Sequence, residues 1–175
     1  MKKNKSKKAD KQPVLVVIKP DGMNKFLVGL ILQKFVATKS ELIAAKVLTV
    51  SRHLAQEHYQ HIKDQTFYRE TIDVMMGKLY PQKQVLALVF WGENVIQKCR
   101  DVAGATNPRE AEPKSVRGSF GRVTSSGIFE NVVHVSSDPK EAEREIKLWF
   151  NPDEISVRLY PTKKIIDNPT TTTWA

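Results

Sequence analysis

The segment that most constrains the fold surrounds His134, where a β-strand must pass directly into an α-helix. Residues 131–135 read NVVHV, which has the β-branched composition of a strand. Asp138, Pro139 and Glu141 then supply a helix N-cap, a first-turn proline and the glutamate of a capping box. His134 is therefore expected at a strand-to-helix junction.

The helix after this junction is expected to bury one apolar stripe. The residues that recur at i, i+4, i+7 and i+8 are Ala142, Ile146, Trp149 and Phe150. Glu145 lies at the edge of this stripe, which would bring its carboxylate near the imidazole of His134. Taken alone, the pair has a simpler interpretation, in which His134 is a hydrogen-bonded core residue and Glu145 lies on the surface.

The composition is typical of one globular domain with charged ends. At 175 residues the chain is long enough to bury a core. It has no apolar run near the ~20 residues of a membrane span, and no apolar secretory segment follows its lysine-rich start. Cys99 is the only cysteine, which excludes an intrachain disulfide and is typical of a reducing compartment. We therefore expect a cytoplasmic protein with a buried Cys99.

The net charge of +9 is concentrated at the two ends of the chain. Residues 1–11 carry six lysines and one aspartate, and residues 156–175 carry three cations and one aspartate, which leaves the body near +2. Residues 1–12 are predicted to be a disordered tail, and 156–175 a loosely structured extension. Weak contact of the tail with a polyanion, either nucleic acid or a membrane surface, is a second interpretation.

Hydrophobic periodicity divides the body into four strands and five helices. The expected strands are 14–18, 42–50, 84–91 and 131–135, and the expected helices are about 28–35, 51–62, 67–79, 93–103 and 139–150. A turn is expected at Pro20-Asp21-Gly22, directly after the first strand. The order predicts a ferredoxin-like α+β sandwich, in which helices cover a four-stranded antiparallel sheet.

Residues 104–130 have no clear periodicity. An unstructured connection of this length is uncommon inside a compact domain unless it has a function. Its two prolines, its Arg-Gly pair and its hydroxyl side chains favour a loop that folds over a ligand. Polar residues also stand at the ends of the predicted elements: Lys19, Tyr59, Arg100, Thr106, Arg117, Asn131 and His134. Each is weak evidence alone, and their spacing does not show that they meet in one cleft.

The motifs, taken in order, resemble the nucleoside diphosphate kinase family. They are VVIKPDG, EHY followed by KDQTFY, GATNP, VRGSF, NVVHVSSD and AEREIKLWF, and the resemblance covers about residues 13–155. It implies that His134 takes the γ-phosphate from a nucleoside triphosphate and passes it to a diphosphate in a ping-pong cycle. A strand joined to a capped helix is a rigid place for such a nucleophile.

The resemblance also implies roles for the other polar residues. Arg100, Arg117 and Thr106 would contact the phosphates, because forked cationic donors suit phosphate oxygens. Lys19 and Asn131 resemble the pair that binds the ribose hydroxyl and the transferring phosphate.

Four further residues complete the implied site. Tyr59 resembles a hydroxyl donor in the phosphate pocket, and Phe67 the aromatic on which the base stacks, a contact that accepts any base. Glu145 and Ser136 would orient the imidazole. The family implies Mg²⁺ carried in by the nucleotide, with no metal ligand from the chain itself, and a homo-oligomer. We favour a hexamer, with a tetramer or dimer as alternatives.

The chain departs from the family pattern in two places near this site. Val135 stands where glycine usually follows the histidine, and residues 120–131 are longer than usual, so the apolar residue on the far side of the base has no clear match. We expect a regular strand through Val135. His53, His58 and His61 are interpreted as helix-surface or packing residues, although His58 and His61 have the i, i+3 spacing of a metal pair.

Two other functions compete with the kinase interpretation. The first is a catalytically weakened relative that binds nucleotide without turnover. The second is an RNA-binding module, because RNA recognition motifs have the same topology. The sequence VRGSFGRV is superficially similar to their signature, but it lies in the predicted loop.

Overall fold

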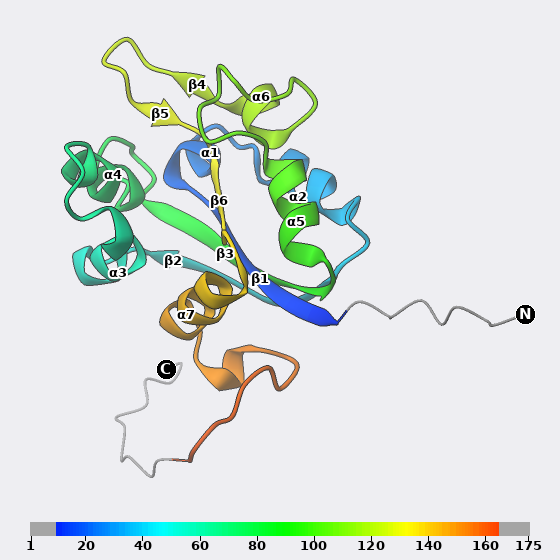
Figure 1. Cartoon of the computed structure of the whole chain (residues 1–175). Helices are drawn as coiled ribbons and strands as arrows, with labels where there is room; N and C mark the ends of the chain where they lie inside the picture. The colour runs from blue at the N-terminus through cyan, green and yellow to red at the C-terminus, as the bar shows by residue number, and fades with distance from the viewer. Residues whose placement is uncertain (1–9, 165–175) are drawn as a thin grey trace, which may run out of the picture.

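The structure, a computed structural model, describes residues 10–164 and is built on one four-stranded antiparallel sheet (Figure 1). The strands are ordered β2-β3-β1-β6, with bounds Glu41–Thr49, Gln84–Glu93, Lys11–Ile18 and Val133–Val135. This is the predicted ferredoxin-like α+β sandwich. Residues 1–9 of the predicted tail and 165–175 of the predicted extension lie outside the described residues, and β1 already begins at Lys11.

Helices cover both faces of the sheet (Figure 1). One face carries α2 (Val28–Val36) and α5 (Val95–Ala103). The other carries α3 (Arg52–His58), α4 (Tyr68–Met75) and α7 (Pro139–Trp149). Short helical turns complete the set: α1 (Pro20–Asn24), the 3-10 turns Gln60–Ile62 and Pro152–Glu154, and α6 (Val116–Phe120).

Alternation along β1 explains why both faces need a helical cover. Val14, Val16 and Ile18 pack in the cluster under α2 and α5, and Leu15 and Val17 pack in the cluster under α3, α4 and α7. All five are fully buried. A strand whose successive side chains enter two different cores must lie inside the sheet, and β1 is central between β3 and β6.

Several predicted elements were wrong in detail, beginning with one turn and two helices. The predicted turn at Pro20-Asp21-Gly22 is the short helix α1, because proline is favoured in a first helical turn. The Ser51 side chain caps a helix as predicted, because its hydroxyl oxygen accepts from the Leu54 amide at 3.1 Å. That helix ends at His58 instead of continuing to Ile62. The helix predicted over 67–79 is shorter, ending at Met75.

The predicted loop 104–130 is largely ordered. It contains α6, whose cap is Ser115, and a hairpin of β4 (Arg122–Val123) and β5 (Phe129–Glu130). The hairpin stands at the top of Figure 1, beyond the end of the sheet. Its turn has Gly127 at φ +88°, a conformation that favours glycine. The RNA-like sequence 116–123 therefore forms helix α6 followed by the short hairpin strand β4, and no part of it lies in the four-stranded sheet.

The start of the predicted C-terminal extension packs on the core. The Ser156 amide donates to the Ile43 carbonyl at 2.9 Å, and Val157, Leu159 and Tyr160 contact the cluster under α7. Within residues 10–164, none of the helices has the length and apolar character needed to cross a bilayer.

The strand predicted over 131–135 begins two residues later than expected. The Val133 amide donates to the Asn131 carbonyl at 2.7 Å, which closes a three-residue turn with Val132 at φ +55°. This is the rarer, strained kind of γ-turn, and a β-branched residue is unusual in it. From Val133 onward the strand is regular, and Val135 is buried with Val133 while His134 faces the other way.

Replacing Val135 by glycine is therefore expected to destabilise the protein, because no backbone strain at this position is relieved. Loss of the buried side chain costs about 1.5–3 kcal/mol. Val47→Gly is the matched control, because Val47 lies on β2 with 60% of its surface exposed and should lose only the backbone contribution, roughly 0.5–1 kcal/mol. Chemical denaturation measures both. A Val135→Gly protein as stable as the parent would contradict the regular strand.

Candidate active site

A cavity of about 880 Å³ opens between α4, the β4–β5 hairpin and the end of β6. Every site residue predicted from the sequence lines it, except Ser136. The lining includes Lys19, Tyr59, Phe67, Arg100, Thr106, Arg117, Asn131, His134 and Glu145. Cations gather at the inner end and aromatic rings at the α4 end, so the cavity suits an anion with a flat apolar group.

The imidazole of His134 is held by a chain of hydrogen bonds. Its Nε2 lies 2.9 Å from Glu145 Oε1, and Ser136 Oγ donates to Glu145 Oε2 at 2.6 Å. Burial alone would raise the pKa of Glu145, but the neighbouring His134 and the Ser136 hydroxyl lower it overall. The carboxylate is therefore ionised and accepts from Nε2–H, which leaves Nδ1 of His134 with its lone pair.

Strand pairing fixes the position of this chain. His134 pairs with Val17 of β1. The Ser136 amide donates to the Leu15 carbonyl at 3.1 Å, and the Leu15 amide donates to the Ser136 hydroxyl oxygen at 3.2 Å. Asp138 caps α7 by accepting from the amides of Lys140 and Glu141. Glu145, two turns further along α7, is thereby directed at the imidazole.

The turn at Val132 is clamped from both sides. Asp21 Oδ2 accepts from the Val132 amide at 2.9 Å, and the Lys19 amide donates to the Val132 carbonyl at 2.9 Å. Asp21 is fully buried, and its Oδ1 has no partner among the described residues. The start of α1 thus holds the strained residue that precedes the strand of His134, a role that sequence reasoning missed.

Lys19 and Arg117 form the inner, cationic wall. Burial lowers the pKa of Lys19, although Asp21 partly opposes this. Arg117 donates to the carbonyls of Gly104 (2.6 Å) and Val133 (3.1 Å), and its Nε has no partner among the described residues. Burial lowers the pKa of Arg117 to about 10, so the guanidinium stays charged at neutral pH.

Arg100 and Thr106 stand nearer solvent, and both are exposed. Asn131 is buried, and its side-chain amide donates to the Thr106 carbonyl at 3.0 Å, which ties the loop after α5 to the γ-turn. Tyr59 ends α3, and its ring lies edge-on to that of His134 at 6.3 Å. Burial, with the charge of Glu145, raises the pKa of Tyr59, so its hydroxyl keeps its proton.

The outer end of the cavity carries two exposed aromatic rings. Phe67, 51% exposed, precedes α4, and Phe129, 39% exposed, lies on β5 with Ile128 beside it. Sequence reasoning missed Phe129, because the added residues of the hairpin obscured the alignment with the family pattern. An apolar residue between a turn glycine and the Asn131 motif is the signal that could have found it.

Glu130 anchors this hairpin to the body of the protein. Its carboxylate accepts from Lys25 Nζ (2.7 Å), Arg122 Nε (2.6 Å) and the Tyr80 hydroxyl (3.1 Å). Burial alone would raise the pKa of Glu130, but these donors lower it to about 2. The anchor is therefore charged across the physiological range.

His58 contacts the site from behind. It is fully buried, its ring centroid lies 4.3 Å from that of His134, and Trp149 Nε1 donates to its Nδ1 at 3.1 Å. His53 and His61 are exposed, so the expectation of surface or packing residues holds for all three. Donor atoms of His58, His134 and Glu145 lie within 4.8 Å of one another. However, Trp149 Nε1–H donates to the lone pair of His58 Nδ1, and Glu145 Oε1 is hydrogen-bonded to His134, so these two donor atoms are already engaged within the protein.

Known proteins with similar sequences and folds share one description. A family model described as nucleoside diphosphate kinase matches residues 12–155. The nucleoside diphosphate kinase of Symbiobacterium thermophilum is 40% identical over 141 residues, 81% of this chain and 88% of that protein. That of Brevibacillus brevis is 39% identical over 144 residues, 82% of this chain and 92% of that protein.

A solved structure has the same fold. It is a transition-state mimic of the nucleoside-diphosphate kinase from Borrelia burgdorferi with bound vanadate and ADP. The TM-score is 0.74 at 29% identity, over 88% of this chain and 93% of that chain.

His58 is expected to make the protein less stable in mild acid. Burial, followed by the charge of His134, lowers the pKa of His58 well below 6.5. Below about pH 6.5, His58 therefore binds a proton in the unfolded chain but not in the folded protein. The free energy of unfolding then falls as pH falls, by up to about 1.4 kcal/mol per pH unit. Denaturation between about pH 7 and about pH 5 should show this slope in the parent and in the exposed control His53→Phe, but not in His58→Phe. An equal slope in His58→Phe would contradict a buried neutral His58.

Proposed function

The chain belongs to the nucleoside diphosphate kinase family and is a phosphotransferase of that class, and we propose that His134 carries the phosphoryl group between its two nucleotides. The observation that carries this proposal is the hydrogen bond of 2.9 Å between His134 Nε2 and Glu145 Oε1. It fixes one tautomer and leaves Nδ1 as the nucleophilic nitrogen. His134 lines the cavity with 16% of its side chain exposed, so the nucleophile is sheltered but reachable.

The reaction has two balanced half-steps. The lone pair of His134 Nδ1 attacks the γ-phosphorus of a nucleoside triphosphate, the bond from that phosphorus to the β–γ bridging oxygen breaks, and the nucleoside diphosphate leaves. The positive charge that the imidazole gains is stabilised by the Glu145 carboxylate. A terminal oxygen of a second diphosphate then attacks the phosphorus, and the N–P bond breaks to return neutral His134.

The cationic wall would stabilise the charge on the transferring phosphate. Arg117 Nε is a buried donor without a partner among the described residues, and a phosphate oxygen would satisfy it. Lys19 and Arg100 line the same cavity and add two cations. Asn131, Thr106 and Tyr59 contribute polar contacts to the nucleotide around this charge. Phosphoryl transfer depends mainly on positioning and electrostatic stabilisation of this kind.

Phe67 and the β4–β5 hairpin would hold the base between them. Phe67 offers one ring face, and Phe129 with Ile128 supplies the opposite apolar wall from the anchored hairpin. Stacking does not distinguish one base from another, because every base has a π-face. We therefore expect broad nucleotide specificity.

Mg²⁺ would enter bound to the phosphates of the nucleotide. The donors around the inner wall are cationic, and the buried carboxylate in the cavity lining, that of Glu145, is occupied by His134 and Ser136. Such residues fit a metal held by phosphate oxygens better than one held by the protein. When bound, the ion neutralises part of the phosphate charge.

The assembly and the location of the protein are further parts of the proposal. We favour a homo-hexamer by resemblance, and the exposed side chain of Leu42 (49%) on edge strand β2 would suit a contact between copies. Light scattering that gave a monomer would reject any such assembly. A cytoplasmic location is supported by the single, buried, reduced Cys99. Contact of residues 1–9 with a polyanion remains a secondary proposal.

The two competing functions are not favoured. A relative without turnover would have no use for an ordered His134–Glu145–Ser136 chain. An RNA-binding module would need its basic and aromatic signature on the sheet, whereas Val116–Phe120 is helical.

Incubation with γ-labelled ATP and Mg²⁺, followed by removal of nucleotide, should leave an acid-labile, base-stable label on His134. His134→Ala should bind nucleotide and carry no label. His53→Phe, which changes an exposed histidine, is the matched control and should label like the parent. Label on a serine, or an unlabelled parent protein, would reject the proposed mechanism.

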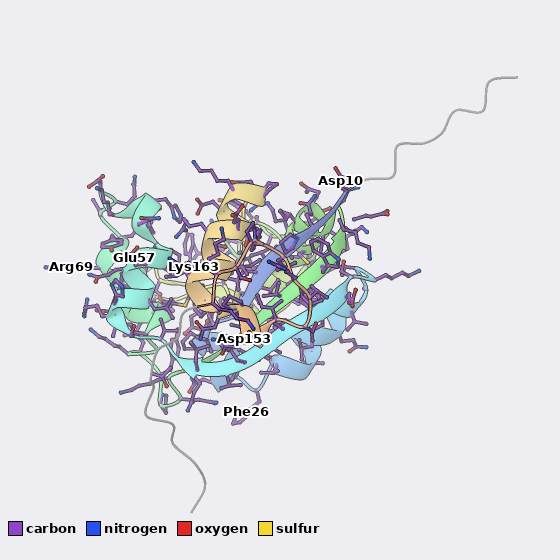
Figure 2. The ribbon with its side chains drawn as sticks, turned by 90° about the horizontal axis from the view of Figure 1, so that it is seen from below. Asp10, Phe26, Glu57, Arg69, Asp153 and Lys163 are labelled. Atoms are coloured by element: carbon purple, nitrogen blue, oxygen red, sulfur yellow. The ribbon has the colours of Figure 1, made fainter. Side chains whose placement is uncertain are left out.

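Phe67→Ala and Phe129→Ala are each expected to weaken nucleotide binding, by roughly 1–3 kcal/mol for loss of a stacking surface. Both should leave phosphorylation by inorganic triphosphate, which has no base, unchanged. Phe26→Ala is the control, because Phe26 is 89% exposed, lies at the rim of the molecule (Figure 2) and does not line the cavity. Steady-state KM values for ATP, GTP and CTP give the comparison. A variant that loses activity equally with inorganic triphosphate would disprove the base clamp.

A further inference from the structure

The imidazole of His58 packs against His134, and the indole of Trp149 holds it in place. Trp149 Nε1 donates to His58 Nδ1 at 3.1 Å, and both side chains are buried. An indole nitrogen only donates, so His58 Nδ1 must accept and cannot carry a proton. The proton of neutral His58 then lies on Nε2, and Trp149 sets this tautomer.

His58 and His134 both lie next to one carboxylate oxygen. Glu145 Oε1 is 2.9 Å from His134 Nε2 and 3.8 Å from His58 Nδ1. The same oxygen also lies 3.9 Å from Arg144 Nη2. A proton on His58 Nδ1 would turn that nitrogen into a second donor toward the same oxygen. His134 would then share its acceptor with a hydrogen-bonding competitor, which weakens the bond that fixes its tautomer and leaves Nδ1 free.

We propose that Trp149 is a positioning residue that keeps His58 from donating to Glu145 and so reserves this carboxylate for His134. The inference rests on the proposed role of His134 as the nucleophile. Neither Trp149 nor His58 touches the cavity, so both act through Glu145 and not on the substrate.

The other ring nitrogen of His58 makes no hydrogen bond that could fix its tautomer. His58 Nε2, the nitrogen that carries the proton, has no hydrogen-bond partner among the described residues. Nothing on that side of the ring selects the tautomer, and a buried N–H without an acceptor is unfavourable. The bond from Trp149 is therefore what holds His58 in this state.

The charged groups around His58 also keep its imidazole neutral, with one exception. His134, Arg144, His61 and Lys19 all disfavour a positive charge on it, and Tyr59, whose ring lies edge-on at 4.6 Å, is neutral. Arg144 also donates to the His58 carbonyl at 3.1 Å, which fixes the end of α3. Glu145 is the exception, because its negative charge attracts a proton to the facing Nδ1. Trp149 blocks that nitrogen.

The test compares one substitution at two tryptophans. Trp149→Phe keeps an aromatic ring and removes the donor, and it should slow labelling of His134 by ATP in a single turnover by about tenfold. Trp91→Phe makes the same change in a partly buried tryptophan of β3 outside the cavity, and it should label like the parent.

A second substitution separates competition from packing. His58→Phe in the Trp149→Phe background should restore most of the lost rate, because the competing imidazole is gone. If Trp149 acted only by packing, loss of a second native side chain would slow labelling further, so a double variant no faster than Trp149→Phe overturns the proposal. A parent protein that takes no label on His134 would instead reject the proposed function.

One further measurement uses the unmodified protein, so it does not depend on whether the variants fold. In ¹⁵N-histidine-labelled protein at neutral pH, long-range ¹H–¹⁵N spectra should show His58 Nδ1 without a proton and Nε2 with one. A protonated Nδ1 would overturn the assignment whatever the variants do.

Discussion

The site depends on one buried carboxylate. Glu145 is 1% exposed, and a charge so far from water is tolerated only when it is paired and hydrogen-bonded. Its two oxygens accept hydrogen bonds from His134, on strand β6, and from Ser136, directly after that strand. Helix α7 and strand β6 must therefore meet in one register, and the cap at Asp138 with the pairing of β6 to β1 provides it.

A second constraint holds the strand that carries His134. Val132 adopts φ +55°, a conformation that costs a β-branched residue on the order of 1–3 kcal/mol. It persists because Asp21 and the backbone of Lys19 grip its peptide on both sides. This strained turn brings Lys19, Asn131 and His134 to the same cavity, so the strain is offset by contacts that also assemble the site.

Local patterns in the sequence predicted the helices and strands but not the long-range contacts between them. The strand of alternating valines, the capped helix and the position of Glu145 followed from periodicity and capping, and the fold class followed from the order of the elements. The γ-turn at Val132 could not be predicted, because it is imposed by a side chain, Asp21, more than a hundred residues away. His58 was likewise a helix residue in the sequence, and only packing brings it against His134.

The central claim is that the bond to Glu145 selects which nitrogen of His134 is phosphorylated. Alkaline hydrolysis of the phosphorylated protein releases phosphohistidine, and its two isomers are separable against synthetic standards. Because Nε2 donates to the carboxylate, the structure requires the phosphoryl group on Nδ1. Recovery of the Nε2 isomer would contradict the account, since it would mean that the nucleophile had first to break the hydrogen bond on which the site is built.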